Sequence, residues 1–297
     1  MNKKNNHVNI KGFLQINKYK GKTFVIKYGG SIMDNEEAKE AFVEDLILMT
    51  RAGIKVVIVH GGGPEINKWL KKTGTENKFV KGLRVTDSET MEIVEMVLSG
   101  NVNKSLSTCL SIRGLNAIGL SGKDSNLIQA KKKFIYENNY KFDIGFVGDI
   151  VDINTDILIN LLKNNYIPVI SPIGSDKEGN SYNINADYAA AFISGVLKAE
   201  KLLIMTDIDG VYTDIQDPST LLPSITVEET KEFIDKGIIS GGMIPKLECC
   251  VTAINKGAKN VQLVDGRKKH SLLTNLIKND GTKIITTKGA NACQKIV

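Results

Sequence analysis

Two glycine-rich turns carry the residue types that suit the binding of a phosphate or a carboxylate. The first lies in residues 25–31 (VIKYGGS) and the second in residues 57–64 (VIVHGGGP). Each follows an apolar run and precedes helix-like sequence, so each places unpaired backbone N–H groups at a helix N-terminus, where the helix dipole favours an anion. A Cβ would hold the ligand away from these amides, which is why glycine suits the turns. Lys27 adds a cation just before the first turn.

Neither turn has the spacing of the common nucleotide-binding motifs. The P-loop pattern G-x-x-x-x-G-K-[ST] and the Rossmann pattern G-x-G-x-x-G are absent from both turns, and residues 121–124 (SGKD) lack the P-loop spacing too. A single Gly-Gly turn after a strand is usually only a tight connection to a helix. Two such turns, one of them beside a lysine, favour an anion site instead.

Two polar clusters suit the recognition of an amino acid. Arg84, in residues 82–87 (GLRVTD), precedes a helix, and its guanidinium could hold a carboxylate in bidentate fashion; a structural salt bridge is the alternative. In residues 183–187 (NINAD), Asn183 and Asn185 alternate with an isoleucine, so both amides are expected on one face with Asp187 close behind. Asn185 could instead cap the following helix.

Two further clusters suit a nucleotide. Residues 206–212 (TDIDGVY) follow an apolar strand at the carboxyl edge of the expected sheet, where ligands bind in open α/β folds. Residues 241–246 (GGMIPK) put Lys246 in the first turns of a helix. Because a lysine there opposes the helix dipole, an anionic partner is expected.

Apolar runs that alternate with amphipathic segments predict the secondary structure around these clusters. Asp34 is expected to cap a helix, and capping boxes at Thr86-x-x-Glu89 and Thr226-x-x-Glu229 are expected to open two more. Alternation of this kind predicts a largely parallel sheet covered on both faces. Hairpin-like sequence at 77–85 and 126–150 predicts an antiparallel lid over one edge. The expected strands are 23–27, 55–59, 116–119, 167–171, 201–206, 260–264 and 283–286.

Composition limits the classes of function. The chain has 297 residues, enough for one large α/β domain or two smaller ones, and no run of about 18 apolar residues or signal-peptide pattern, so a cytoplasmic protein without membrane partners is expected. The net charge of +6 comes mostly from lysines interleaved with acids. The dense run 131–133 is interpreted as the solvated face of a hairpin, not a nucleic-acid patch, and the mild positive charge would attract small polyanions.

Cysteine and histidine usage argues against a metal centre. The four cysteines form no C-x-x-C pair, and the adjacent Cys249 and Cys250 in helical sequence suit reduced, packed thiols. The three histidines are scattered, which does not favour a His-ligated metal site.

The six motifs, in this order, resemble the amino-acid-kinase family, and within it the members that phosphorylate N-acetyl-L-glutamate. The likeness runs from about Gly21 to the C-terminus. It implies a three-layer αβα sandwich around an open, mainly parallel eight-stranded sheet, formed by a single domain from residue 23 to 297. Its N-lobe (about 23–198) would bind the acyl amino acid and its C-lobe (about 199–297) the nucleotide. The implied activity is transfer of the γ-phosphoryl group of MgATP to the side-chain carboxylate of N-acetyl-L-glutamate, in arginine biosynthesis.

The resemblance also implies a role for each motif. Lys27 and Lys246 would flank the transferring phosphoryl group as catalytic residues, with Asp187 holding both. Such a reaction needs alignment and charge neutralisation, and no general base, since a carboxylate is already ionised at neutral pH. The implied phosphoryl and nucleotide residues are Gly29, Gly30, Gly62, Thr206, Asp207, Asp209, Gly210, Val211, Ile238, Ile239 and Ser240, and the implied substrate residues are Gly62, Gly63, Arg84 and Asn183, with Mg²⁺ carried by ATP and no metal held by the protein alone.

The N-terminal extension, residues 1–22, is similar to an oligomerisation helix of arginine-inhibited members. Its stripe of Phe13, Ile16 and Tyr19 precedes the first strand and has no obvious place in the core, so it is expected to contact a neighbouring subunit and to build a hexamer from homodimers. Tyr19 and His270 match the arginine-site region. The acidic turn of those members is altered at residues 279–281 (NDG), so any arginine inhibition is expected to be weak. A Ser125-Asn126 pair replaces a usual Gly-Gly, which would affect only a turn.

Three other functions remain open at this level. A sister kinase acting on aspartate, glutamate, carbamate or a nucleotide would share the glycine turns and Lys27, although the Arg84 and Asn183 motifs favour an acetylated amino acid. A Rossmann oxidoreductase would need G-x-G-x-x-G after its first strand. A non-catalytic arginine sensor or partner-binding module would be expected to lack Lys27, Asp187 or Lys246, and all three are present.

Overall fold

An eight-stranded sheet forms the centre of the computed structural model, which describes residues 15–33, 35–137, 140–278 and 280–286. The strand order is β14-β16-β15-β11-β1-β2-β8-β5. Neighbours pair in parallel except β15 and β16, which are antiparallel. The strands are β1 (Thr23–Tyr28), β2 (Lys55–His60), β5 (Ala117–Ser121), β8 (Ile167–Ser171), β11 (Lys201–Thr206), β14 (Ser224–Thr226), β15 (Val261–Asp265) and β16 (Lys283–Ile285).

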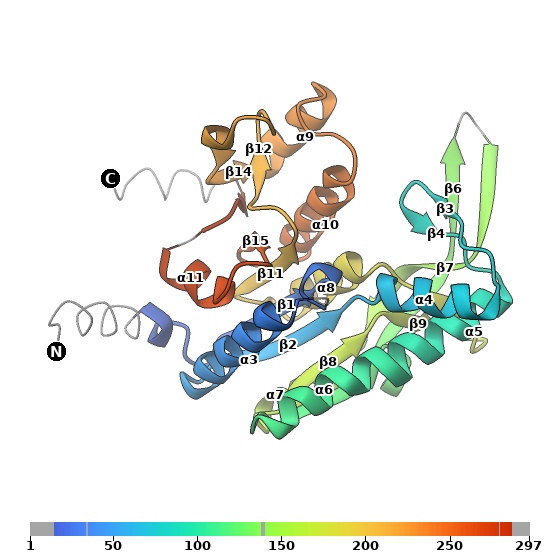
Figure 1. Ribbon diagram of the computed structural model, residues 1–297, viewed down its shortest axis with the longest axis horizontal. Coiled ribbons are helices and arrows are strands. Elements are labelled where there is room, and N and C mark those ends of the chain that lie inside the picture. Colours follow the sequence, from blue (N-terminus) through green and yellow to red (C-terminus); the bar gives the residue numbers. More distant parts are fainter. Residues whose placement is uncertain (1–14, 34, 138–139, 279, 287–297) are drawn as a thin grey trace, which may run out of the picture.

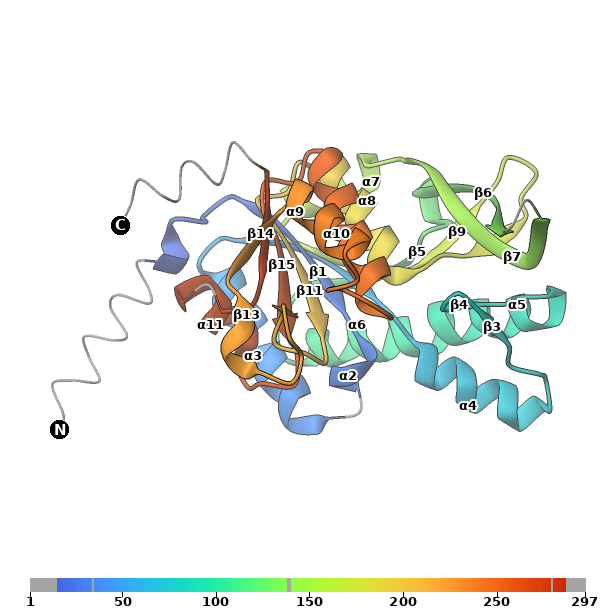
Figure 2. The same ribbon diagram turned by 90° about the horizontal axis from the view of Figure 1, so that it is seen from above.

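Helices cover both faces of this sheet (Figure 2). Phe24 and Ile26 of β1 pack into the core under α3, while the intervening Val25 packs into the core on the other face, as the alternation of a buried strand requires. One face carries α3 (Glu36–Arg51), α6 (Asn103–Ile112) and α11 (Ser271–Lys278); the other carries α7 (Asp156–Lys163), α8 (Ala186–Val196) and α10 (Met243–Asn255). The predicted three-layer sandwich with a mainly parallel eight-stranded sheet is confirmed.

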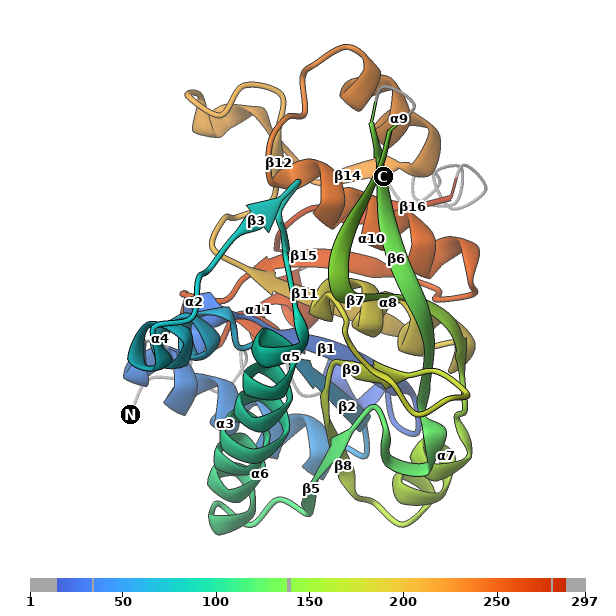
Figure 3. The ribbon, with the colours of Figure 1, turned by 90° about the vertical axis from the view of Figure 1, so that its right-hand side faces the viewer.

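A second, smaller set of strands rises from the same edge as the second glycine turn. The strands β6 (Ile128–Glu137), β7 (Tyr140–Ile153), β9 (Ile173–Ser175) and β10 (Ser181–Asn183) close on one another as a small barrel. The hairpin of β3 (Phe79–Val80) and β4 (Leu83–Arg84) packs against β6 and β7 through a small apolar cluster. Figure 1 and Figure 3 show both hairpins projecting in the same direction. The two predicted hairpins are confirmed, and the longer one proves to be part of a barrel.

One long helical run lies alongside the barrel and the sheet. It consists of α5 (Ser88–Glu95), a π-helical segment η1 (Met96–Val102) and α6, which follow one another without a break (Figure 1). The remaining elements are α2 (Gly30–Met33), α4 (Gly63–Thr73), η2 (Asp124–Asn126), β12 (Val211–Tyr212), η3 (Pro218–Thr220), β13 (Leu221–Leu222) and α9 (Val227–Asp235).

The helix starts agree only partly with the predicted caps. The capping box at Thr226 is confirmed. The one expected at Thr86 is wrong: Asp87 caps α5 by accepting from the Thr90 N–H, and the buried Thr86 hydroxyl donates to the Arg84 carbonyl instead. The cap of α3 is Asn35, one residue after the expected Asp34, which lies outside the described residues.

The described part of the N-terminal stripe packs against this chain's own core. Ile16 is 8% exposed, and Tyr19 meets the Phe24 ring edge-on with centroids 5.1 Å apart. The expectation that this stripe has no place in the core is therefore wrong for these two residues. Phe13 lies outside the described residues.

Other predictions concern the surface, the turns and the cysteines. Lys132 pairs with Asp143 at 2.7 Å and Lys133 pairs with Asp149, so the lysine run is matched by acids of the facing strand β7. Ser125 and Asn126 both take positive φ values (55° and 53°), a turn conformation that glycine adopts more easily.

The described cysteines 109, 249 and 250 are free thiols. In the described ranges, no helix is both long and apolar enough to cross a membrane.

Candidate active site

Lys27 and Lys246 meet at a single carboxylate, that of Asp187. Lys27 Nζ lies 2.9 Å from Asp187 Oδ1, and Lys246 Nζ lies 3.5 Å from Oδ2. The three residues come from three elements: Lys27 is the fifth residue of β1, Asp187 the second of α8 and Lys246 the fourth of α10. Parallel strands followed by crossover helices bring these positions to one edge of the sheet.

Asp187 stays ionised because the two lysines outweigh its burial. The residue is 9% exposed, and burial alone would raise its pKa. The charges and hydrogen bonds of Lys27 and Lys246 reverse this effect and hold the pKa of Asp187 below its ordinary value. The start of α8 also favours the negative charge through its dipole. With two cations and one anion, the site keeps a net positive charge, which suits a polyanionic ligand.

The first glycine turn borders this group and the second adjoins the first, since a Cβ at Gly30 would lie 3.4 Å from Pro64. A Cβ at Gly29 would lie 2.9 Å from the Met205 carbonyl oxygen and 3.2 Å from Lys27 Nζ. A Cβ at Gly62 would collide with the Leu98 side chain. Gly29 precedes the short helix α2, and Gly62 is the N-cap residue of α4. The predicted strand-turn-helix context of both turns is therefore present. A side chain at Gly29 would press against the Met205 backbone, whereas one at Gly62 would require Leu98 to move.

A cavity of about 180 Å³ opens beside the second turn. Arg84 lies at its edge, 7% exposed, and its guanidinium donates to two neutral amides: NH2 to Asn67 Oδ1 at 2.7 Å, and NH1 to Asn77 Oδ1. Burial lowers the pKa of this guanidinium. Among the described residues no carboxylate lies within ion-pair distance of it. The lining residues are Gly61, Gly62, Gly63, Ile66, Phe79, Gly82, Leu83, Arg84, Leu98, Val147, Pro172, Asn183, Ile184, Asn185 and Ala186.

The asparagines at the end of β10 and two residues after it, Asn183 and Asn185, have different partners. Asn183 lines the cavity and donates to Thr86 Oγ1 at 3.3 Å. Asn185 also borders the cavity, but its side-chain oxygen accepts from the Asp187 and Tyr188 N–H groups, so it is the N-cap of α8. The expectation that both amides serve one ligand-facing surface is wrong for Asn185, because its carbonyl is used by the helix.

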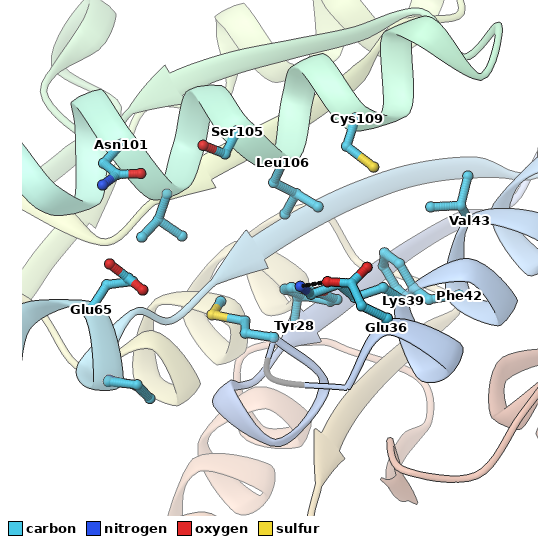
Figure 4. A pocket seen from close by; sticks show the side chains of 13 residues that line it. Tyr28, Glu36, Lys39, Phe42, Val43, Glu65, Asn101, Ser105, Leu106 and Cys109 are labelled. Atoms are coloured by element: carbon cyan, nitrogen blue, oxygen red, sulfur yellow. Dashed lines mark hydrogen bonds and ion pairs between the residues drawn. The ribbon is translucent and has the colours of Figure 1, made fainter. Parts of the chain in front are cut away.

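A larger hollow of about 340 Å³ lies elsewhere, between α3 and α6 (Figure 4). Its walls include Tyr28, Phe42 and Leu106, with Lys39 paired to Glu36 at its rim (2.6 Å). It contains neither Lys27 nor Lys246. The two lysines do not line the smaller cavity either, but its wall includes Ala186, the residue next to Asp187, so the lysine–carboxylate group adjoins the smaller cavity.

The residues after β11 form a tight loop that is bonded to Thr282, the residue before β16. The Gly210 Cα faces Thr282, and the Val211 N–H donates to Thr282 Oγ1 at 2.8 Å. Thr206 donates to Asp207 at 3.1 Å. The Asp209 carboxylate is paired with Lys268 (2.6 Å) and accepts from the Tyr212 hydroxyl. The side chains of Thr206, Asp207 and Asp209 are therefore all bonded within the protein.

Residues 238–240 precede α10. Ile239 is buried in the core, whereas Ile238 and Ser240 are exposed. Ile238 and Ser240 are thus available on the surface, and the Ile239 side chain is not.

The two residues expected at an arginine site have separate partners. His270 Nδ1 lies 2.8 Å from Asp45, a buried residue of α3, and its Nε2 lies 3.7 Å from Glu44. Tyr19 packs on Phe24, with the buried Lys201 ammonium 5.7 Å from its ring. Lys201 donates to Gln262 and Asn275, and burial lowers its pKa to about 8.

Three residues of the site escaped the sequence analysis. Asn67 and Asn77, which hold Arg84, lie 17 and 7 residues from it, and no local pattern marks them. His60 immediately precedes the second glycine turn, and its place there is the one sequence feature that could have pointed to it.

Comparison with known proteins identifies the family of this chain. A model of the amino acid kinase family matches residues 22–265. Acetylglutamate kinase of Clostridium acetobutylicum is 53% identical over 283 residues, covering 95% of this chain and 96% of the relative. Acetylglutamate kinase of Methanococcus aeolicus is 47% identical over 283 residues, covering 94% and 96%.

Solved structures agree in fold. A protein from Streptococcus mutans superposes with a TM-score of 0.72 at 32% identity, covering 89% of this chain and 98% of that one. N-acetylglutamate synthase from Neisseria gonorrhoeae, solved with coenzyme A and N-acetyl-glutamate, superposes with a TM-score of 0.80 at 23% identity over 94% of this chain. This chain spans 62% of the synthase's length. At that identity the likeness concerns the fold alone.

Proposed function

We propose that this chain, which belongs to the amino acid kinase family and within it to the acetylglutamate kinases, transfers the γ-phosphoryl group of ATP to the side-chain carboxylate of N-acetyl-L-glutamate. The product is N-acetyl-L-glutamyl 5-phosphate, an intermediate of arginine biosynthesis. The observation that carries the proposal is the pair of lysines on one buried carboxylate, 2.9 and 3.5 Å away, beside a cavity that holds an arginine with no acidic partner among the described residues.

Arg84 supports an amino-acid substrate. A buried guanidinium bonded only to amides gains most from a ligand carboxylate, because a charge-assisted bidentate pair is stronger than bonds to neutral groups. We assign the α-carboxylate of the substrate to Arg84 and Asn183, and the rest of the amino acid to the wall formed by Gly62 and Gly63. Its side-chain carboxylate then extends toward Lys27.

The transfer itself needs no general base. A side-chain carboxylate oxygen attacks the γ-phosphorus, the bond from that phosphorus to the bridging oxygen breaks, and ADP leaves with the electron pair. Lys27 and Lys246 neutralise the charge on the transferring group, and Asp187 keeps the two ammonium groups apart and oriented. The amides of Gly29, Gly30 and Gly62 are assigned to the phosphoryl oxygens.

The nucleotide and its metal are assigned to the other lobe. We infer that residues 23–198 bind the acyl amino acid and residues 199–297 the nucleotide, along the loop from Thr206 to Val211 and the exposed Ile238 and Ser240. Within the part of the chain that the structure describes, no group of three or more His, Cys, Asp or Glu is arranged to hold a metal ion. Mg²⁺ is therefore proposed to arrive with the triphosphate, where it would neutralise phosphate charge.

Assembly and regulation belong to the same proposal. We infer that the protein is cytoplasmic and forms homodimers, and that the residues before Ile16 join the dimers into a hexamer. Tyr19 and His270 are assigned to a weak arginine site. Because Ile16 and Tyr19 pack on this chain's own core, the contact with a neighbouring subunit is assigned to the residues before them. The weakness follows from the altered acidic turn around Asp280, whose backbone carbonyl is already used by Asn275 and Gln262.

The test is an ADP-release assay with four acceptors: N-acetyl-L-glutamate, L-glutamate, L-aspartate and N-acetyl-L-aminoadipate. The proposal expects turnover with N-acetyl-L-glutamate and at least about tenfold lower kcat/KM with each of the others. L-Glutamate and L-aspartate lack the acetyl group, and the side chain of N-acetyl-L-aminoadipate is one methylene longer. Background ADP release with N-acetyl-L-glutamate, alongside clear turnover of glutamate, aspartate or a nucleotide, would overturn it.

A further inference from the structure

His60 is fully buried at the end of β2 and is bonded on both sides of its ring. Its Nδ1 lies 2.7 Å from the carbonyl oxygen of Gly61, and its Nε2 lies 3.1 Å from the side-chain nitrogen of Asn103 in α6. Asn103 is also fully buried. The ring thus connects the second glycine turn to the start of α6, in the long helical run of α5, η1 and α6.

The neighbours of Asn103 fix the direction of these bonds. Its Nδ2 lies 2.8 Å from the Val169 carbonyl and 3.2 Å from the Leu120 carbonyl, so the amide nitrogen must face these oxygens and donate. An amide nitrogen has two protons, which these two carbonyls and His60 Nε2 share, and because it can only donate, Nε2 is an acceptor. The ring proton is left on Nδ1, where it donates to Gly61. Burial lowers the pKa of His60 to about 4, which agrees with a neutral ring.

The bond to Gly61 sets the direction of the next amide. The Gly61 carbonyl and the Gly62 N–H belong to one planar trans peptide and point in opposite directions. Holding the carbonyl against His60 therefore turns the Gly62 N–H away from the ring. The Gly61 N–H is bonded as well, to the Tyr28 carbonyl at 2.9 Å, so the peptides on both sides of Gly61 are fixed.

The π-helical segment η1 supplies a second support. Leu98 and Val102 of this segment pack against Gly62, closely enough that a Cβ at Gly62 would collide with Leu98. The segment ends one residue before Asn103. Short π-helical insertions are frequent near functional sites. Here Leu98 of the segment contacts the turn, and Asn103, the residue directly after the segment, contacts His60.

We propose that His60 is a positioning residue for phosphoryl transfer: with Asn103 it holds the Gly61–Gly62 peptide so that the Gly62 N–H faces the transferring phosphoryl group. This inference rests on the proposed function, because it needs a phosphoryl oxygen to receive that N–H. His60 does not touch the substrate and moves no proton. Its effect on catalysis is confined to the direction of one amide.

Two substitutions separate this role from simple packing. In His60→Asn, the side-chain nitrogen takes the place of Nδ1 and can still donate to Gly61. In His60→Gln, the amide reaches the place of Nε2 and can still meet Asn103, but the donor to Gly61 is lost. Asparagine leaves the larger void, so His60→Asn should be the less stable protein. Positioning predicts the opposite order for kcat.

The experiment measures thermal unfolding and steady-state kinetics of the wild type and both variants. We expect a lower Tm for His60→Asn, yet a kcat for His60→Gln that is at least about tenfold below that of His60→Asn, with similar KM for ATP. Affinity for ADP with aluminium fluoride, a mimic of the transferring group, should fall in the same order, while affinity for ADP alone stays unchanged.

The outcomes distinguish this inference from the proposed function. A wild type that is inactive with N-acetyl-L-glutamate contradicts the proposed function, and the aluminium fluoride affinities then still rank the two variants. An active wild type whose variants lose kcat in the order of their Tm values, or a His60→Gln enzyme with near-normal kcat, overturns the positioning role.

Discussion

The ammonium groups of Lys27 and Lys246 share the buried carboxylate of Asp187 at the centre of the site, and this arrangement determines the role of each of the three residues. Asp187 is fully used by Lys27 and Lys246, so it is an organiser and not a proton acceptor. Each lysine is assigned to one side of the phosphoryl group, so removing either leaves part of the transition-state charge without a partner.

The first prediction follows from this arrangement. Lys27→Ala and Lys246→Ala should each lower kcat by about 100-fold or more in the ADP-release assay. Lys259→Ala is the matched control, since Lys259 pairs with Glu200 on the surface (3.1 Å) and should leave kcat unchanged. A Lys27→Ala enzyme with near-normal kcat would be incompatible with the assignment.

Arg84 gives a second prediction at the same scale. Arg84→Ala should raise the KM for N-acetyl-L-glutamate by about tenfold or more, with little change in the KM for ATP, because it removes binding of the α-carboxylate and not of the nucleotide. Initial rates with each substrate varied in turn measure both constants. An equal rise in both KM values would indicate a general disturbance of the fold instead.

His60 makes stability depend on pH. Its folded-state pKa is about 4, below the ordinary value of 6.5, so the unfolded chain binds more protons between these values and stability falls as pH falls. Between pH 7 and 5 this one residue should cost about 2 kcal/mol of unfolding free energy. Urea titrations of wild type and His60→Gln at both pH values measure it; the loss should be smaller in the variant, and equal losses would contradict the neutral, buried ring.

At the scale of elements, Asp45 of α3 stabilises the start of α11. Its Oδ2 accepts the Leu272 and Leu273 N–H groups, and its Oδ1 faces His270. This is a helix cap supplied from more than 200 residues away in sequence, and it is fully buried.

A fourth prediction compares this cap with a local, exposed one. Asp45→Ala should lower the unfolding free energy by about 2–3 kcal/mol because buried donors lose their acceptor, whereas Thr226→Ala should cost about 1 kcal/mol. Denaturant unfolding measures both, and kcat should be unchanged in both. A larger loss from Thr226→Ala would show that the Asp45 contacts do not stabilise α11.

The elements that could be predicted from sequence are those with a local cause. All seven expected strands are present within two residues of their predicted ends, because a strand buried on both faces needs a continuous apolar run. The short β14 at the sheet edge, only three residues long, gave no such run. The cap expected at Thr86 failed because the neighbouring Asp87 competes for the same helix start.

The site could be predicted only as a set of motifs. Lys27, Asp187 and Lys246 were each marked by a turn or a helix start, and the structure brings them together. The supports could not be found in this way: Asn67 and Asn77 beside Arg84, and Asn103 beside His60, act across the fold and leave no local pattern. The π-helical segment that places Asn103 likewise depends on its packing against the glycine turn.

At the scale of the whole molecule, the first described residues of the chain are packed into its core. Ile16 is buried in the core around α3, so a deletion that removed it would disturb folding as well as assembly. Removal of residues 1–14 avoids this. By light scattering, the shortened chain should have the mass of a dimer while the full chain has that of a hexamer, and it should keep its kcat. An unchanged mass would rule out the assembly proposed for these residues.

The central claim is that a phosphoryl group passes to a side-chain carboxylate between Lys27 and Lys246. Hydroxylamine trapping tests this most directly, because it converts an acyl phosphate to a hydroxamate. With ATP, Mg²⁺ and N-acetyl-L-glutamate, the account predicts N-acetylglutamyl hydroxamate in equal amount to the ADP released, with both lost together in Lys27→Ala. Release of ADP without any hydroxamate from the wild-type enzyme would contradict it.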